Sequence, residues 1–349
     1  MKSLLRNRPA VCLFLSLILL ALVPAVLATS GVIIVFDPPN STGTSASSIN
    51  DLGVITGSYG DSSTGTGRGF VRDRDGVFTV FDATDSPGIT TSATSINNSG
   101  AVTGFYCYPS TSTGTCHGFV REQNGAITVF DPADSNYTNA ASINNYGEIT
   151  GYYFDVSTGT YRGFVRHEHG EITAFDPAGS AFTIPTSVND KGVITGWYSD
   201  KPTGTGIRLG FVRDQYGIIT AFDATGSKNT TPTGISNYGA AAGSTCDAIT
   251  GTCHGFVRYE HGGVKVFDPS GSAGTLPSSI NNMGVITGSY SDKFVIRARG
   301  FVRDGYGVIT VFDPERSAVT FPRSINDQGT ITGSYDDLAF RSHGFVRQP

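Results

Sequence analysis

Beyond its first 28 residues, the chain has no long apolar run, no apolar residues at helical spacing and few charges. Without a second long apolar stretch, the remaining chain is predicted to contain no integral membrane span. Without helical periodicity, a helical fold is disfavoured. Charged residues make up only 15% of the chain, whereas Gly, Ser and Thr are abundant. This composition is typical of an all-β protein with many tight turns.

The chain also lacks the common motifs of catalysis. It has no Gly-x-Ser-x-Gly elbow, no phosphate-binding loop and no zinc-protease signature. One metal-like pattern, His167-Glu168-His169, occurs once, and the sequence names no third ligand for it. We therefore expect no cofactor and no metal, and the sequence favours a non-enzymatic protein over an enzyme.

The N-terminal segment is typical of a secretory signal peptide. Three basic residues precede an almost entirely apolar run at 11–27, and cleavage is expected after Ala28. An uncleaved membrane anchor is the alternative. The predicted organisation is a signal peptide at 1–28 and a single domain at 29–349, in a secreted, extracellular or periplasmic protein.

Removal of that segment takes the formal net charge from −5 to −8, because three positive charges leave with it. Nucleic acids and anionic membranes bind basic surfaces, so an acidic chain disfavours both as partners.

A short set of motifs recurs along the rest of the chain. Ser-Ile-Asn, Ile-Thr-Gly, Gly-Phe-Val-Arg and Phe-Asp return at spacings of 44 to 49 residues, in seven copies. A period in this range indicates a repeat architecture. The Gly-Phe-Val-Arg segments begin at Gly69, Gly118, Gly163, Gly210, Gly255, Gly300 and Gly344.

One repeat is long enough for four short strands, here named a, b, c and d. In the third repeat they are expected at 139–144, 148–154, 161–166 and 171–176. Gly-containing turns join a to b and c to d, whereas the longer d–a connections often contain Pro and are expected to cross to the next sheet. This pattern predicts a seven-bladed β-propeller of four-stranded antiparallel blades. A β-solenoid, the alternative, has shorter repeats and parallel strands.

The repeats begin and end out of phase. A lone strand d is expected at 32–37, and the last repeat, 321–347, supplies strands a, b and c without d. Pairing of the two termini in one blade closes the ring and leaves no unpaired edge. The register then places Asp37 beside His343.

Four cysteines remain beyond the signal segment, as two close pairs in repeats two and five. Each pair holds facing positions on the expected strands b and c, which predicts the disulfides Cys107–Cys116 and Cys246–Cys253. A four-Cys zinc site is the alternative, although the spacings match no common zinc knuckle. Disulfides fit an exported protein.

Three repeats carry His-Gly-Phe followed by Val-Arg, at His117, His254 and His343, after segments of the type Ile-Asn-x-x-Gly-x-Ile-Thr-Gly. This pattern resembles the HAF family of bacterial extracellular repeat proteins, named for a His-Ala-Phe triplet. The resemblance covers essentially all of the chain after the signal segment. The sequence differs in having Gly for Ala, and Arg or Leu for His in four repeats. The resemblance implies export and a repeat fold, and it implies no catalytic residue.

Strand d ends in Asp in every repeat, and the residue before Gly-Phe is basic in six. The register predicts the cross-strand pairs Arg68–Asp82, His117–Asp131, Arg162–Asp176, His254–Asp268 and Arg299–Asp313. We expect these pairs to be structural, with a general base as the alternative, since a catalytic group has no reason to recur in every blade. The seven Arg residues of Gly-Phe-Val-Arg are expected to bond carbonyls of neighbouring blades, with an anion-binding ring as the alternative.

The loops predict where a ligand binds. The b–c and d–a loops emerge on one face and vary between repeats, whereas the a–b and c–d turns are nearly uniform in length and chemistry. Variable loops on a rigid scaffold commonly carry binding sites. We therefore place the ligand site on the b–c/d–a face, with rim residues Tyr108, Asp155, Asp200, Asp247 and Asp292. Neutral variation of these loops is the alternative.

Aromatic doublets occur on strand b, at Phe105-Tyr106, Tyr152-Tyr153 and Trp197-Tyr198. Successive residues of a strand point to opposite faces, so most of these rings are expected to pack between blades. Stacking on a sugar at the surface is the alternative.

Taken together, these features favour an exported, non-enzymatic and monomeric propeller. It would act as a binding scaffold for a protein or carbohydrate of the cell envelope or its surroundings. One alternative is an exported carbohydrate-active hydrolase or lyase with its site on the b–c/d–a face. The other is a purely structural surface protein.

Overall fold

The computed structural model describes residues 31–349 apart from 110–113, 202, 204–205, 228 and 295–296. The signal peptide predicted at 1–28 lies outside the described residues. The described residues form 28 strands and no helix, which confirms the all-β prediction. In this part of the chain, no helix is long and apolar enough to cross a membrane.

Strands of four kinds alternate along the chain. The a strands are β2 (Ser41–Ile49), β6 (Thr90–Ile96), β10 (Ser135–Ile143), β14 (Phe182–Val188), β18 (Thr230–Ile235), β22 (Ser272–Ile280) and β26 (Ser317–Ile325). The b strands are β3 (Ile55–Asp61), β7 (Val102–Cys107), β11 (Ile149–Asp155), β15 (Ile194–Ser199), β19 (Ala241–Cys246), β23 (Ile286–Asp292) and β27 (Ile331–Asp337). The c strands are β4 (Thr66–Arg72), β8 (Cys116–Arg121), β12 (Thr160–Arg166), β16 (Arg208–Arg213), β20 (Cys253–Arg258), β24 (Ala298–Arg303) and β28 (Ser342–Arg347). The d strands are β1 (Ile33–Phe36), β5 (Phe78–Phe81), β9 (Ile127–Phe130), β13 (Ile172–Phe175), β17 (Ile219–Phe222), β21 (Val264–Phe267) and β25 (Ile309–Phe312).

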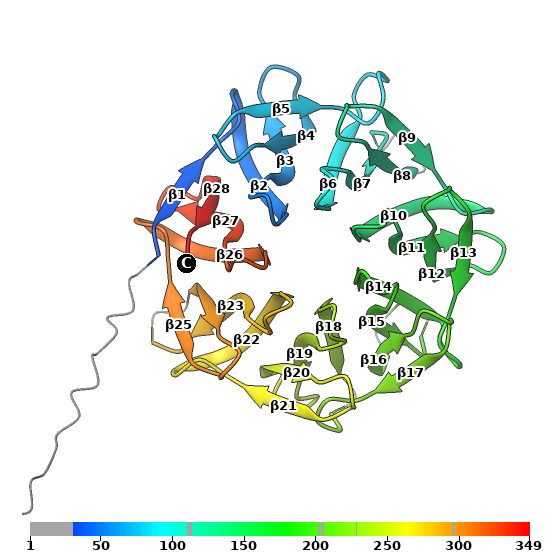
Figure 1. Ribbon diagram of the computed structural model, residues 1–349, viewed down its shortest axis with the longest axis vertical. Coiled ribbons are helices and arrows are strands. Elements are labelled where there is room, and N and C mark those ends of the chain that lie inside the picture. Colours follow the sequence, from blue (N-terminus) through cyan, green and yellow to red (C-terminus); the bar gives the residue numbers. More distant parts are fainter. Residues whose placement is uncertain (1–30, 110–113, 202, 204–205, 228, 295–296) are drawn as a thin grey trace, which may run out of the picture. The chain divides into compact units, whose positions relative to one another are not determined.

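The strands pair as antiparallel meanders. Three meanders stand alone, in the orders β2-β3-β4-β5, β18-β19-β20-β21 and β22-β23-β24-β25. Three more, from β6 to β17, join into one 12-stranded sheet through the single parallel contacts Cys116–Tyr137 and Tyr161–Phe182. Figure 1 shows the meanders around a common centre, with the a strands innermost and the d strands outermost. This arrangement is a β-propeller.

The N-terminal strand completes the sheet that holds the C-terminus. β1 pairs antiparallel with β28, with Ile33 opposite Arg347 and Phe36 opposite Gly344. The sheet order is β1-β28-β27-β26, and Figure 1 shows the blue β1 beside the red β28. The predicted pairing of the termini is therefore confirmed.

Strand a is longer than expected in the third repeat. β10 begins at Ser135, not at 139, because the d–a connection is a tight turn in which Asp134 adopts a φ of 58°. The four prolines of the a strands sit at or next to β-bulges, as Pro185 does. Proline is tolerated there because strand a is the edge of its own meander.

The core repeats in every sheet. Phe119 of Gly-Phe-Val-Arg is fully buried, and its ring meets the edge of Phe81, from the d strand of the preceding sheet, with centroids 5.9 Å apart. The residue before this Phe is Gly118, because a Cβ there would lie 2.8 Å from the ring of Phe130 on the neighbouring d strand. The same Phe–Phe contact recurs between every successive pair of meanders.

The Arg of Gly-Phe-Val-Arg does not bond the carbonyls of a neighbouring blade, so that prediction is wrong. The guanidinium of Arg72 donates to the carbonyl of Asp73 in its own c–d turn, at 3.2 Å. Its contact with the neighbouring sheet is a cation–π interaction, 4.8 Å from the ring centre of Phe36. The other six arginines repeat this contact. A planar guanidinium stacks well on an aromatic ring, and the Phe ring of the preceding d strand lies within its reach.

Two series of Asn and Asp side chains connect the a–b turns around the centre, and the sequence did not predict them. In the first, an Asn amide donates to the next turn, as from Asn50 to the Asn97 carbonyl at 2.9 Å. In the second, the Oδ1 of one turn accepts from the main chain of its neighbour, as from Asp51 N–H to Asn98 at 2.9 Å. Both series also link the last repeat to the first, through Asn326 and Asp327.

Candidate binding site

The predicted rim residue Asp155 caps the b–c turn. Its carboxylate accepts hydrogen bonds from the Ser157 hydroxyl at 2.6 Å and the Ser157 N–H at 2.9 Å, and it pairs with Arg162 at 3.2 Å. The Ser157 hydroxyl, followed by Arg162 and main-chain N–H groups, lowers the pKa of Asp155 to about 2 against the opposing effect of burial. The side chain is buried, so the structure uses it to hold the turn.

Three further rim residues also cap their turns. The Oδ1 of Asp247 accepts from the N–H groups of Ile249 and Thr250, and that of Asp292 accepts from Phe294 N–H. Asp200 accepts from Ile207 N–H at 3.1 Å. This capping explains why Asp recurs at the end of strand b. A ligand-binding role for these residues stays a prediction.

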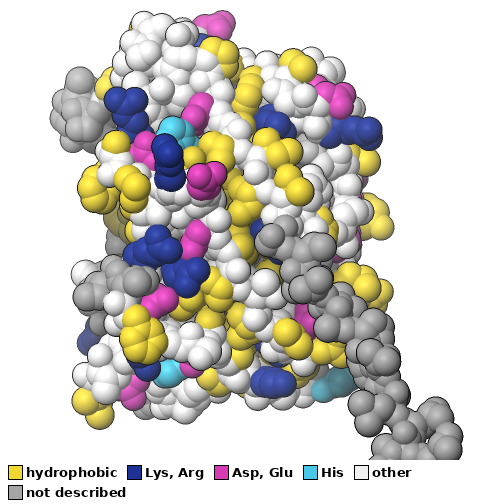
Figure 2. Space-filling model, turned by 90° about the vertical axis from the view of Figure 1, so that its left-hand side faces the viewer, with side chains coloured by type: hydrophobic (Ala, Val, Ile, Leu, Met, Phe, Trp, Pro, Cys, Tyr) yellow, Lys and Arg dark blue, Asp and Glu magenta, His cyan; other side chains and the backbone are white. Residues whose placement is uncertain are grey.

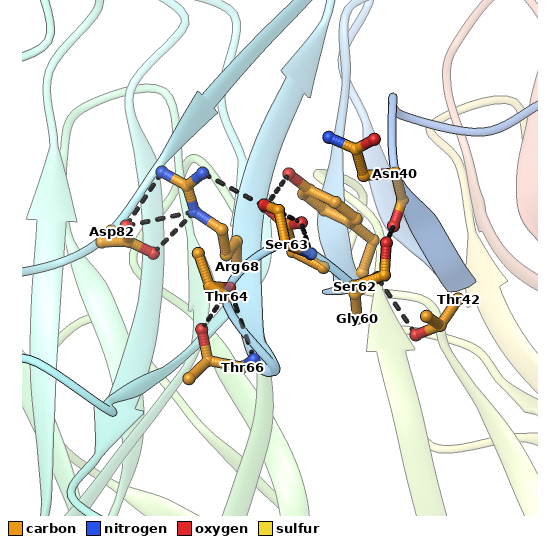
Figure 3. Close-up of polar contacts among 11 residues, drawn as sticks. Asn40, Thr42, Gly60, Ser62, Ser63, Thr64, Thr66, Arg68 and Asp82 are labelled. Carbon is orange, nitrogen blue, oxygen red and sulfur yellow. Dashed lines mark hydrogen bonds and ion pairs between the residues drawn. The ribbon is translucent and has the colours of Figure 1, made fainter.

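The first repeat shows the same arrangement (Figure 3). Arg68 lies between Asp82, with which it shares contacts of 2.9 to 3.2 Å, and Asp61, whose carboxylate accepts from Ser63. All five predicted cross-strand pairs form, with closest distances between 2.6 and 2.9 Å. In the repeat with Leu209 before Gly-Phe, Asp223 accepts from Thr225, Gly226 and Thr230.

Tyr108, the fifth rim residue, lies partly exposed at the end of β7. Its ring meets Tyr106 and His117 edge-on, with centroids 5.7 and 5.8 Å apart. Burial, helped by the hydrogen bond and charge of Tyr108, raises the pKa of Tyr106 to about 12. The two tyrosines and the His117–Asp131 pair form one packed surface group.

Both predicted disulfides form, and the four-Cys zinc alternative is wrong. Cys107 faces Cys116 across β7 and β8, and Cys246 faces Cys253 across β19 and β20. His167 lies 3.2 Å from Glu148. Among the described residues, no three or more His, Cys, Asp or Glu side chains are placed to hold a metal ion.

The aromatic doublets divide as the strand geometry requires. The second residues, Tyr106, Tyr153 and Tyr198, are buried between sheets. The first residues are only half-buried, and two of them, Tyr152 and Trp197, line a shared pocket. We call it the aromatic pocket, and it is lined by Tyr137, Tyr152, Tyr161, Phe182, Ile184, Trp197, Thr203 and Arg208.

The rings of the aromatic pocket form a continuous chain across two meanders. Tyr137 stacks on Tyr152 with centroids 6.1 Å apart, and Tyr161 approaches Phe182 at 4.9 Å. Phe182 in turn stacks on Trp197 at 5.5 Å. These contacts fix the rings before any ligand arrives, which lowers the entropic cost of binding.

The aromatic pocket belongs to the predicted ligand face and adjoins the central channel. Tyr137 and Phe182 stand near the start of β10 and β14, where the d–a loops enter. The a strands surround a central channel, and Leu276 is one of the residues that line it. Ile184 holds the same position in its repeat as Leu276, because Ile184 faces Trp197 and Leu276 faces the equivalent Ser289. The pocket therefore lies next to this channel.

The signal for this pocket was present in the sequence as a departure from the repeat pattern. At the position of Tyr152 and Trp197, the other repeats carry Ser58, Phe105, Ser244, Ser289 and Ser334. The doublets drew attention to Tyr152 and Trp197, but Tyr137, Tyr161, Phe182 and Arg208 were missed. Only the paired register shows that these residues converge.

The a–b and c–d turns of the opposite face are uniform in length, but their side chains differ between repeats. Four tyrosines lie at the tips of these turns, with exposed fractions from 66% to 94%: Tyr146, Tyr216, Tyr238 and Tyr306.

Figure 2 shows one side of the molecule. Basic and acidic groups lie interspersed among apolar ones there, without a broad field of one sign.

Known structures support the fold assignment. No family model and no curated protein matches the chain. A streptogramin B lyase structure is 13% identical over 91% of this chain and 98% of its own, with a TM-score of 0.56. Virginiamycin B lyase from Staphylococcus aureus is 14% identical over 91% and 99%, with a TM-score of 0.57. The β-propeller domain of the Trilobed protease from Pyrococcus furiosus is 9% identical over 87% and 95%, with a TM-score of 0.62. At these identities the likeness shows the class of protein, a β-propeller, and not an activity.

Proposed function

We propose that the chain is an exported protein of HAF-type repeats that folds as a closed ring of seven blades and serves as a binding scaffold. Its partner is a glycan or protein of the cell envelope or its surroundings. The two disulfides favour an oxidising compartment, extracellular or periplasmic, and agree with the signal peptide expected from the sequence.

The aromatic pocket is the observation that carries this proposal. Asp, His and Arg side chains that recur in the repeats are engaged in caps, cross-strand pairs and contacts between sheets. The pocket is different because, among the residues that the structure describes, its half-buried rings depart from the repeat pattern. Tyr and Trp are the residues most enriched where proteins bind partners, since they offer large rigid surfaces with a polar end.

Binding of the mature chain to glycan arrays and to envelope extracts tests the proposal. Two variants with matched chemistry locate the site: Tyr152→Ala with Tyr161→Ala removes rings from the aromatic pocket, and Tyr216→Ala with Tyr306→Ala removes exposed rings from the opposite face. We expect the first double variant to lose most binding and the second to retain it.

Two results would count against the proposal. Loss of binding only in the Tyr216/Tyr306 variant would move the site to the opposite face. Release of shortened products from a bound glycan would replace the scaffold with a hydrolase or lyase. Thermal unfolding of each variant shows whether a loss of binding reflects a loss of fold.

A further inference from the structure

Arg208 is the one charged residue that lines the aromatic pocket, and no Asp or Glu does so within the part of the chain that the structure describes. Register places Arg208 where the other repeats have uncharged residues: Gly67, Cys116, Tyr161, Cys253, Ala298 and Ser342. The pocket is therefore locally basic in an acidic protein, which favours a ligand with negative charge.

The guanidinium of Arg208 is held in place. It lies 4.8 Å from the centre of the Trp197 ring, and Trp197 is itself stacked on Phe182 with an angle of 21° between the rings. A planar guanidinium fixed on an aromatic ring presents its N–H groups in a fork that matches the two oxygens of a carboxylate. The indole thus fixes the position of the cation at the wall of the pocket.

The other wall consists of Tyr137, Tyr152 and Tyr161, each of which combines an aromatic ring with a hydroxyl. Phenols, with an ordinary pKa of about 10, are protonated donors at neutral pH, and burial, with the charge of Tyr137, raises the pKa of Tyr152 and Tyr161 further. The face of a pyranose ring is lined with C–H groups and its rim with hydroxyls. Such a ring fits a wall of phenols better than a purely apolar molecule does.

The size of the pocket limits how much ligand it can hold. Its volume is about 300 Å³, at the lower end of the range for small-molecule sites. It therefore suits one sugar unit of a chain, not an extended oligosaccharide.

We propose that the aromatic pocket binds a uronate unit of an acidic polysaccharide. Arg208 pairs with the sugar carboxylate, and the tyrosine rings pack against the sugar ring. This inference rests on the proposed function and names the class of its ligand.

The chain contains a single Trp, so tryptophan fluorescence reports on this pocket alone. The mature protein is titrated with an oligogalacturonate of defined length and with its fully methyl-esterified form. The two probes share a backbone and differ in charge. We expect saturable changes in Trp197 emission with the acid, and affinity at least tenfold weaker for the ester.

Arg208→Gln removes the charge and keeps most of the side-chain volume. We expect it to weaken acid binding at least tenfold and to leave ester binding nearly unchanged. Arg323→Gln is the matched control, because Arg323 also lies over an aromatic ring, 6.0 Å from the centre of Phe321, but outside the aromatic pocket. We expect the control to bind like the unmodified protein.

Several outcomes overturn the inference. Equal affinity for acid and ester, or an Arg208→Gln variant that binds the acid normally, removes the role of the carboxylate. Stronger binding of a planar aromatic acid, such as indole-3-acetate, identifies a site for aromatic acids instead of sugars. If envelope partners bind while uronates do not, the inference fails and the scaffold function stands. If neither binds, both fail.

Discussion

The Oδ2 atom of Asp37 lies 2.6 Å from Nδ1 of His343, although the two residues are 306 positions apart. His117 and Asp131 make the same contact within a continuous stretch of chain, also at 2.6 Å. The N-terminal strand therefore takes the place of the missing strand d in the last meander, with the same register and the same polar pair. The two ends of the chain are thus joined by a long-range contact that no local interaction could supply.

Deletion of residues 29–38 should strongly destabilise the protein. It removes the β1–β28 ladder and Phe36, whose ring packs on Phe70 and Phe78 with centroids 6.3 and 6.0 Å away. Loss of one buried Phe typically costs about 3–5 kcal/mol, and β28 also becomes an exposed edge. Urea unfolding measures the change, with the chain that starts at residue 29 as the control. An equally stable deletion variant would contradict this role for β1.

Stability that depends on His343 should decline at alkaline pH. Partial burial lowers the pKa of His343, but the hydrogen bond and charge of Asp37, with those of Asp337, outweigh burial and raise it above its ordinary value. A group whose pKa is raised by folding stabilises the folded state fully at pH values below its unfolded pKa, which is about 6.5 for His. This stabilisation is lost as pH rises through the folded pKa. His343→Gln should therefore lower the free energy of unfolding more at pH 5.5 than at pH 8.5. Equal losses at the two pH values would refute the prediction, and NMR titration of the imidazole gives an independent measure.

Each disulfide should contribute modestly to stability. They link residues 9 and 7 positions apart, and the chain-entropy relation for loops this short gives roughly 2–3 kcal/mol each. Replacement of Cys107 and Cys116 by Ser should lower the free energy of unfolding by this amount, and so should replacement of Cys246 and Cys253. The two losses should add, because the pairs lie in different meanders. Peptide mapping without reduction checks the pairing, and a Cys107–Cys246 peptide would contradict it.

Ser236→Asn should stabilise the protein. Ser236 occupies the place of Asn in the first series of a–b turn contacts, where Asn281 donates to Asn326 at 2.9 Å and Asn189 donates to Ser236 at 2.8 Å. An Asn at this position gains an amide that reaches the next turn, and one such hydrogen bond contributes about 0.5–1.5 kcal/mol. Urea unfolding should show a gain of this size, and Asn97→Ser, the reciprocal change, should show a similar loss. A destabilised Ser236→Asn variant would show that the turn has no room for the amide.

Much of the structure follows from repeated local signals. Alternating apolar residues, Gly at turns that need positive φ and the phase of the first and last repeats predict the strands, the pairing of β1 with β28 and both disulfides. Gly147 and Gly170, for example, adopt φ values of 77° and 96°. Such features can be predicted because each depends on backbone sterics, on ladder register or on the phase of the repeats. Within one repeat, register relates residues that are already close in the sequence, whereas the β1–β28 pair follows from the phase of the first and last repeats.

The sequence by itself determined the strand order, the cross-strand pairs such as Arg68–Asp82 and the meeting of the termini. Tertiary structure alone decided which side chains from different repeats come together. Arg72 stacks on Phe36 instead of bonding a carbonyl, Asn50 reaches Asn97, and Tyr161 meets Phe182 in the aromatic pocket. The reason is geometric: contacts within a sheet follow its register, whereas contacts between sheets depend on how closely and at what angle the sheets pack.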